Sequence, residues 1–148
     1  MFRADDHADS PDEWIELAER WANIATAAHS KPGSESEVWS IAGFVCECLL
    51  KGLAMKRLGL NSWPSRDTCK MQNYQALYSH DLRAIAALAG LNVNAHDVIA
   101  PRWKIVLQWR RYHMYASGHG MSEAVKRDLI ESAIGSNGVA EWLKKQIN

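Results

Sequence analysis

The sequence has no excess of charge of either sign. Among its 148 residues, 17 Lys and Arg side chains balance 17 Asp and Glu side chains. A chain with this balance has no overall field that would hold it on nucleic acid or on an anionic membrane. Any such binding must therefore come from a local patch of charge.

Cysteine is scarce, since the chain contains only Cys46, Cys48 and Cys69. An odd number of cysteines behind an acidic N-terminal segment, where a secretory leader would be apolar, favours a reducing cytoplasm and buried thiols. Cys46 and Cys48 are two residues apart, so a helix points them about 200° away from each other. Because one metal ion could not easily bind both, and the histidines lack metal-ligand spacing, we expect no metal site and no cofactor.

Long hydrophobic runs are absent as well. The longest apolar stretch, residues 41–50, is interrupted by Glu47 and is shorter than the roughly 20 residues that a membrane span requires. We therefore expect a core helix and no membrane partner. Gly118 and Gly120 are not followed by the Lys and Ser or Thr of a phosphate-binding glycine loop, which disfavours a nucleoside triphosphatase.

Apolar residues recur at helical spacing along most of the chain. Ser10 and Pro11 have the features of a helix start, and the periodicity continues to about His29. A second helix is expected over residues 36–58, and between Ile41 and Met55 it is apolar on nearly every side, which is typical of the central helix of a bundle. Further helices are expected over residues 80–89, 101–114, 122–134 and 139–147, with loops over residues 59–78 and 117–120.

These elements predict one all-α domain over residues 1–148, built as an up-and-down bundle of about five to six helices around a central apolar helix, with residues 1–9 frayed. In the central helix, Gly43 and Gly52 indicate close approach by neighbouring helices. Glu47 and Lys51 are four residues apart. They mark either a solvated edge of that helix or a pair that is partly buried and neutralises itself.

Three short motifs occur in a fixed order, at residues 47–53 (Glu-Cys-Leu-Leu-Lys-Gly-Leu), 79–82 (Ser-His-Asp-Leu) and 109–112 (Trp-Arg-Arg-Tyr), and a late aromatic residue, Trp142, follows them. In this order they resemble the HEPN family of small helical domains, over about residues 36–147. The resemblance implies a helical bundle, a homodimer, and binding of RNA or nucleotide in a toxin–antitoxin or phage-defence setting. It also implies a partner protein such as a nucleotidyltransferase. The family-motif positions Glu47, Lys51, His80 and Asp81 are expected to be structural.

Active ribonucleases of that family use an Arg, four to six intervening residues and a His. Here two and one residues separate Arg110 and Arg111 from His113, and eight and seven separate them from His119. The leading hypothesis is therefore a non-catalytic or degenerate HEPN-like protein that binds RNA, nucleotide or a partner protein. Two alternatives stay open: a metal-independent endoribonuclease that uses a displaced pair from Arg110, Arg111, His113 and His119, and a purely structural helical adaptor.

One segment concentrates basic and aromatic side chains that are suited to nucleic acid. Its basic residues are Arg102, Lys104, Arg110, Arg111 and His113, and its aromatic residues are Trp103, Trp109, Tyr112 and Tyr115. The competing interpretation is that Trp103 and Trp109 belong to the core while the basic residues are a solvated face. His80 and Asp81 are open to two interpretations as well, as half of an acid–base system or as groups that cap and orient the next helix.

Overall fold

The computed structural model describes residues 7–115 and 122–148, and every regular element in these two ranges is a helix. The prediction of an all-α bundle is confirmed. The elements are α1 (Pro11–His29), α2 (Glu35–Arg57), α3 (Arg66–Gln72), the 3-10 helix η1 (Gln75–Tyr78), α4 (Leu82–Leu88), α5 (Ala100–Val106), the 3-10 helix η2 (Arg111–Tyr115), α6 (Glu123–Ile134) and α7 (Val139–Ile147).

α1 begins as its sequence predicts. The Ser10 hydroxyl accepts a hydrogen bond from the Glu13 amide at 3.2 Å, and Pro11 occupies the first turn. The Glu13 carboxylate accepts in turn from the amide of Asp9 at 2.6 Å, one residue before the amide that a capping box normally uses. This local network fixes the start of α1 and the direction of the segment that precedes it.

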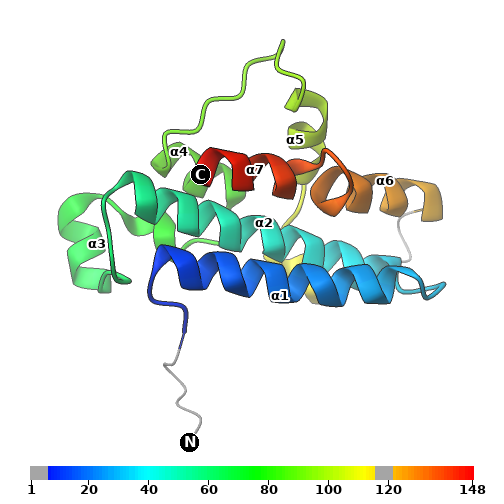
Figure 1. Cartoon of the computed structure of the whole chain (residues 1–148), viewed down its shortest axis with the longest axis horizontal. Coiled ribbons are helices and arrows are strands. Elements are labelled where there is room, and N and C mark those ends of the chain that lie inside the picture. The colour runs from blue at the N-terminus through cyan, green and yellow to red at the C-terminus, as the bar shows by residue number, and fades with distance from the viewer. Residues whose placement is uncertain (1–6, 116–121) are drawn as a thin grey trace, which may run out of the picture.

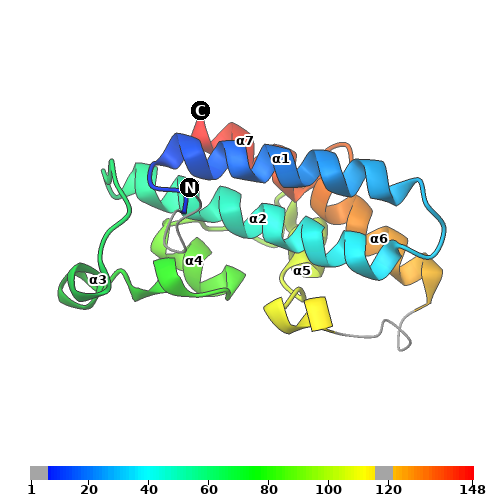
Figure 2. The same ribbon diagram turned by 90° about the horizontal axis from the view of Figure 1, so that it is seen from below.

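α2 is the centre of the bundle. It packs against α1, α4, η2, α6 and α7, and each residue from Val45 to Met55 is buried. Figure 1 shows α1 along one side of α2 and α6 and α7 along the other, and Figure 2 shows α4 and η2 beneath it. A helix that is apolar on nearly every side is stable in water only when it is surrounded in this way.

α2 is also long and apolar enough to cross a membrane, judged by length and composition alone. Its most apolar window is 89% buried within the bundle, as in the core helix of a folded domain. The apolar part of α2 is therefore longer than the stretch over residues 41–50 on which the sequence argument relied, because buried apolar residues continue it on both sides: Val38, Trp39, Leu53, Ala54 and Met55.

The thiols of α2 lie in this core. Cys46 and Cys48 are free and buried, as is Cys69 of α3. Burial raises the pKa of Cys46 and of Cys48 to about 12, because a thiolate would have to form without water around it. The two thiols are therefore protonated and unreactive at neutral pH.

The expected loop over residues 59–78 is wrong in part, because it contains α3 and η1. The Ser65 hydroxyl caps α3 by accepting from the Thr68 amide at 3.1 Å, and Asn73 ends it in the left-handed conformation with φ of 59°. Pro64 precedes the cap and is compatible with it. The two short elements project beside α2, at the end where α1 begins (Figures 1 and 2).

The expected helix over residues 101–114 is wrong at its centre. α5 ends at Val106, and the chain turns through residues 107–110 before η2 begins at Arg111. The Arg110 guanidinium donates to the Leu107 carbonyl at 2.6 Å and to the Trp109 carbonyl at 2.8 Å, which satisfies carbonyl groups that a continuous helix would have paired. The other boundaries agree to within two residues. The predicted loop at residues 117–120 lies outside the described residues.

The contact between Gly43 and Trp109 explains why the chain turns here. Trp109 is fully buried, and its indole Nε1 donates to the Ser40 carbonyl of α2 at 3.1 Å. A Cβ at position 43 would overlap the indole ring. The prediction that Gly43 allows close approach is confirmed, and the approaching group is a side chain of the turn after α5 rather than a helix.

We predict that Gly43→Ala lowers the free energy of unfolding by about 3 kcal/mol, because the methyl group forces the Trp109 indole out of its site. Urea unfolding followed by circular dichroism measures the change. In the Trp109→Leu background the added methyl group meets no indole ring. There Gly43→Ala should lower the free energy of unfolding by less than about 1 kcal/mol, since Ala also has the higher helix propensity. An equal cost in both backgrounds would show that the overlap with Trp109 is not the cause.

Candidate functional site

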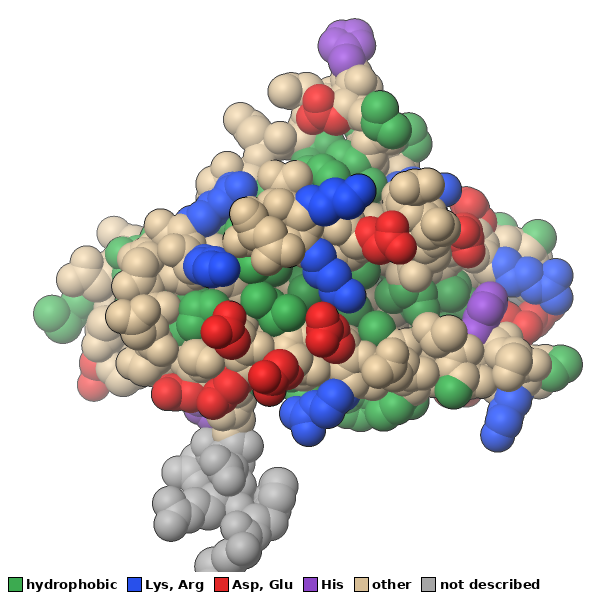
Figure 3. Space-filling view, in the orientation of Figure 1, with side chains coloured by type: hydrophobic (Ala, Val, Ile, Leu, Met, Phe, Trp, Pro, Cys, Tyr) green, Lys and Arg blue, Asp and Glu red, His purple; other side chains and the backbone are tan. Residues whose placement is uncertain are grey.

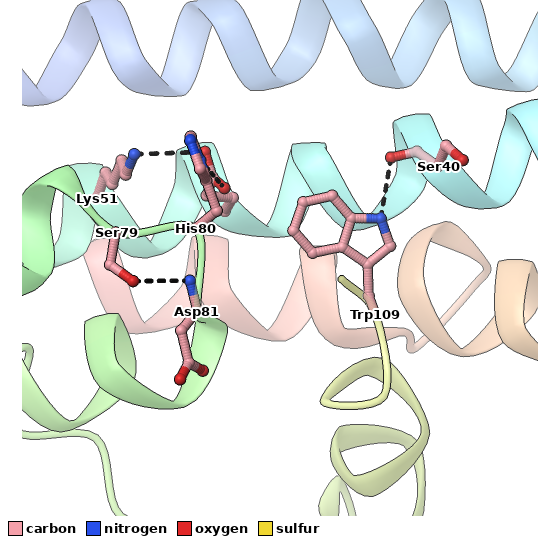
Figure 4. A network of polar contacts seen from close by, with 7 residues as sticks. Ser40, Lys51, Ser79, His80, Asp81 and Trp109 are labelled. Carbon is pink, nitrogen blue, oxygen red and sulfur yellow. Dashed lines mark hydrogen bonds and ion pairs between the residues drawn. The ribbon is translucent and has the colours of Figure 1, made fainter. Parts of the chain in front are cut away.

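The carboxylate of Glu47 joins two of the three sequence motifs. Only 1% of its side chain is exposed. Its Oε2 lies 3.3 Å from the Nζ of Lys51, one turn along α2, and its Oε1 lies 2.9 Å from Nδ1 of His80 (Figure 4). A buried carboxylate requires such partners, because the loss of hydration is otherwise not offset.

Lys51 is buried with Glu47, so the pair is not a solvated edge of α2. The Lys51 Nζ lies 5.3 Å from the ring centroid of Trp14 and 5.9 Å from that of Trp63. Aromatic faces attract a cation that has lost part of its water. The interpretation of the pair as buried and self-neutralising is confirmed, and two indoles complete its surroundings.

His80 and Asp81 are neighbours with separate roles. Asp81 Oδ1 accepts from the Arg83 amide at 2.9 Å, which caps α4, and Figure 4 shows its carboxylate turned away from the His80 ring. The His80 side chain is 50% exposed although its Nδ1 contacts the buried Glu47. Because an ionised carboxylate only accepts, the proton lies on Nδ1, and Nε2 is the ring nitrogen that does not contact Glu47.

A cleft of about 560 Å³ opens over this network. Its wall on α1 includes Arg20 and the carboxylates of Glu13 and Glu16, and its opposite wall includes His80 and Arg111. Lys51, Glu47 and Trp14 line its floor with Phe44, and the guanidinium carbon of Arg111 lies 5.3 Å over the Phe44 ring. All three motifs of the sequence therefore meet at one place.

A smaller hollow of about 400 Å³ adjoins the cleft. It is lined by His80, Asp81, Arg110, Arg111 and Tyr112. His80 and Arg111 line both spaces, so they form the boundary between them. This pair, drawn from segments far apart in the chain, is the centre of the candidate site.

The segment that the sequence singled out as a basic patch is divided in space. Arg102 donates to the Ser136 carbonyl at 2.8 Å and lines a different cleft, of about 680 Å³, beside Trp142 of α7. Lys104 is exposed on α5, and the Arg110 guanidinium closes the turn after that helix. Of the cations in this segment, Arg111 is the one placed beside Lys51 and His80.

The aromatic residues of the segment are divided too. Trp103 and Trp109 are buried in the core, as the competing interpretation held, so their faces are closed to a ligand. Tyr112 is exposed. The structure does not describe the Tyr115 side chain.

His113 is held by its own turn. Its Nδ1 accepts from the Arg110 amide at 3.1 Å, and its ring lies 6.5 Å from the ring of Trp39. Partial burial, and then the nearby Arg110 charge, lower the pKa of His113. The neutral form is therefore favoured, and it supports η2 rather than facing the cleft. His119, the other candidate for a displaced pair, lies outside the described residues.

Several residues of the cleft were not predicted. Arg20 and Phe44 give no motif in the sequence, and Trp14 has only the periodicity of an apolar face. Helical spacing shows which face of α1 is turned inward, but not which residues of other elements lie opposite it. The motif residues that give a sequence signal for this cleft are Glu47, Lys51, His80 and Arg111.

Comparison with known proteins adds no identification. No family model matches the chain, and no curated protein or solved structure matches it either. The resemblance to the HEPN family therefore depends on the motifs of the sequence alone.

We predict that Glu47→Gln lowers the free energy of unfolding by about 3 kcal/mol, because it leaves the buried Lys51 cation without a counter-charge. Chemical denaturation monitored by tryptophan fluorescence measures this loss. The matched control is the double variant Glu47→Leu with Lys51→Met, which removes both charges together and should cost much less. A double variant as unstable as Glu47→Gln would mean that apolar packing, not charge pairing, dominates here.

Proposed function

We propose that the cleft binds the phosphoryl group of a nucleotide or of an RNA end, with Arg111 as the anchoring cation and His80 beside it. The observation that carries this proposal is that His80 and Arg111 line the same two hollows above the buried Glu47. The HEPN resemblance supports it, because that family works on RNA or nucleotides. A cytoplasmic homodimer, a partner protein such as a nucleotidyltransferase and a toxin–antitoxin or phage-defence setting belong to the same proposal.

Arg111 is suited to an anionic ligand. Among the residues that the structure describes, it makes no ion pair with a carboxylate, and the negative charge of Glu47 is matched by Lys51. Stacking of the guanidinium on Phe44 leaves its N–H groups at the edge of the ring plane, where they donate to phosphate oxygens in a planar fork. Arg20 supplies a second cation from the opposite wall.

The size and charge of the cleft restrict the ligand. A volume of about 560 Å³ is in the range of small-molecule sites. The α1 wall carries Glu13 and Glu16, and Figure 3 shows acidic side chains gathered along the first part of that helix. Since such a wall repels an extended polyanion, we infer that the ligand is a nucleotide or a short single-stranded end rather than a duplex.

Binding of AMP to the purified protein, measured by isothermal titration calorimetry, tests this proposal. We expect Arg111→Gln to weaken binding by roughly tenfold to a hundredfold, as expected for loss of a charge-assisted hydrogen bond. Lys104→Gln is the matched control, because it removes an equally basic residue from the exposed face of α5. Equal loss in both variants would indicate only general electrostatics, and absence of binding at low salt would favour the structural adaptor.

A specific observation supports a second function, metal-independent cleavage of RNA. The Nδ1 of His80 lies 2.9 Å from Glu47, which leaves Nε2 as the nitrogen that can accept a proton, and Arg111, which lines the same cleft, can stabilise negative charge on a phosphate. The displaced Arg and His pair would then be Arg111 and His80. His113, in contrast, uses its Nδ1 within η2.

Incubation of labelled RNA with the protein in the presence of a chelator tests for this activity. If cleavage occurs, we expect His80→Ala to reduce its rate by at least about a hundredfold, the usual contribution of a general base. His113→Ala, a histidine variant outside the cleft, should retain most of it. Cleavage that survives His80→Ala in a folded protein would exclude this assignment.

A further inference from the structure

Tyr112 is an exposed aromatic residue of the smaller hollow. It follows Arg111 directly, lines the smaller hollow, and is 65% exposed. A large aromatic side chain in this position exposes an apolar face to water, which is unfavourable. A planar ligand group that stacks on this face would bury it.

The Tyr112 ring packs against one neighbouring side chain. It contacts the His113 ring edge to face, with centroids 4.9 Å apart and planes at 70°. His113 is fixed in turn by the hydrogen bond from the Arg110 amide, and the Arg110 guanidinium fixes the turn through the carbonyls of Leu107 and Trp109. A ring that already packs against a fixed neighbour loses less conformational freedom when a ligand stacks on it than an isolated ring does.

The other residues of the smaller hollow already have partners within the protein. Asp81 caps α4, and Arg110 closes the turn after α5. The groups that remain for a ligand are Tyr112 and the boundary pair, His80 and Arg111. A phosphate held between His80 and Arg111 would direct one ester substituent into the cleft and a second one into the smaller hollow. A phosphate with two ester substituents is a phosphodiester.

We propose that the smaller hollow is a subsite for a nucleobase that stacks on Tyr112, so that the preferred ligand is a dinucleotide whose phosphodiester lies at Arg111. This inference rests on the proposed function, since it assumes that Arg111 holds a phosphate. The stacking itself is tolerant of base identity, because every base presents a planar face.

The test uses the full chain and two probes, the dinucleoside monophosphate ApA and the base-free ribose 5-phosphate, with affinities from calorimetry or from NMR titration. Tyr112→Ala should weaken ApA binding roughly tenfold, the usual range for loss of one stacked base, and leave ribose 5-phosphate unchanged. Tyr112→Phe should retain the affinity for ApA. Tyr112→Leu, which keeps apolar bulk without an aromatic face, should behave as Tyr112→Ala does.

The outcomes separate the two proposals. If Arg111→Gln weakens both probes while Tyr112→Ala leaves ApA binding unchanged, the subsite is overturned and the phosphate site stands. Loss of ApA affinity in Tyr112→Phe would also overturn the subsite, because the phenolic hydroxyl would then be responsible. If Arg111→Gln affects neither probe, the phosphate site itself fails, and the subsite fails with it. Unchanged melting temperatures of the variants confirm that each is folded.

Discussion

The carboxylate of Glu47 lies in the middle of the most apolar helix of this protein, and its need for partners organises the surroundings. Lys51 satisfies one oxygen from within α2, but the other oxygen requires a group from elsewhere in the chain. His80 supplies it and is thereby tied to α2 at the start of α4. One buried negative charge thus determines where the chain before α4 approaches the core, and it also determines which nitrogen of His80 carries the proton.

The contact between Gly43 and Trp109 has a comparable effect on the second half of the site. Gly43 and Glu47 are four residues apart and so lie on the same face of α2. The missing side chain at position 43 admits the Trp109 indole, and the chain that follows it carries Arg111 and Tyr112 to the side where His80 lies. Gly43 and Glu47, on one face of α2, therefore position the segments of Arg111 and His80. These segments form the boundary between the cleft and the smaller hollow.

Much of the fold could be predicted from the sequence because its causes are local. Ser10 with Pro11, and Ser122 at the start of α6, are capping signals that act within one turn, and the spacing of Glu47 and Lys51 is a property of a single helix. The errors occurred where distant groups decide the outcome. α5 stops because Trp109 must reach Ser40, and α3 forms beside Pro64 in a segment with little apolar periodicity. For the site, the motif residues were identified but not their meeting at one cleft, since no spacing in the sequence relates Glu47 to His80. Arg20 and Phe44 lacked any signal at all.

The fit of the Trp109 indole over a residue without a side chain also restricts how this sequence can diverge. The space between α2 and the turn is shared by two positions that are 66 residues apart in the chain. A larger residue at position 43 is compatible with the fold only if the residue at position 109 becomes smaller. A smaller residue at position 109 beside an unchanged Gly43 leaves a cavity, which lowers the stability of the protein. Positions 43 and 109 should therefore covary among related sequences. Where both residues have changed, we expect the segment with Arg111 and Tyr112 to approach α2 differently.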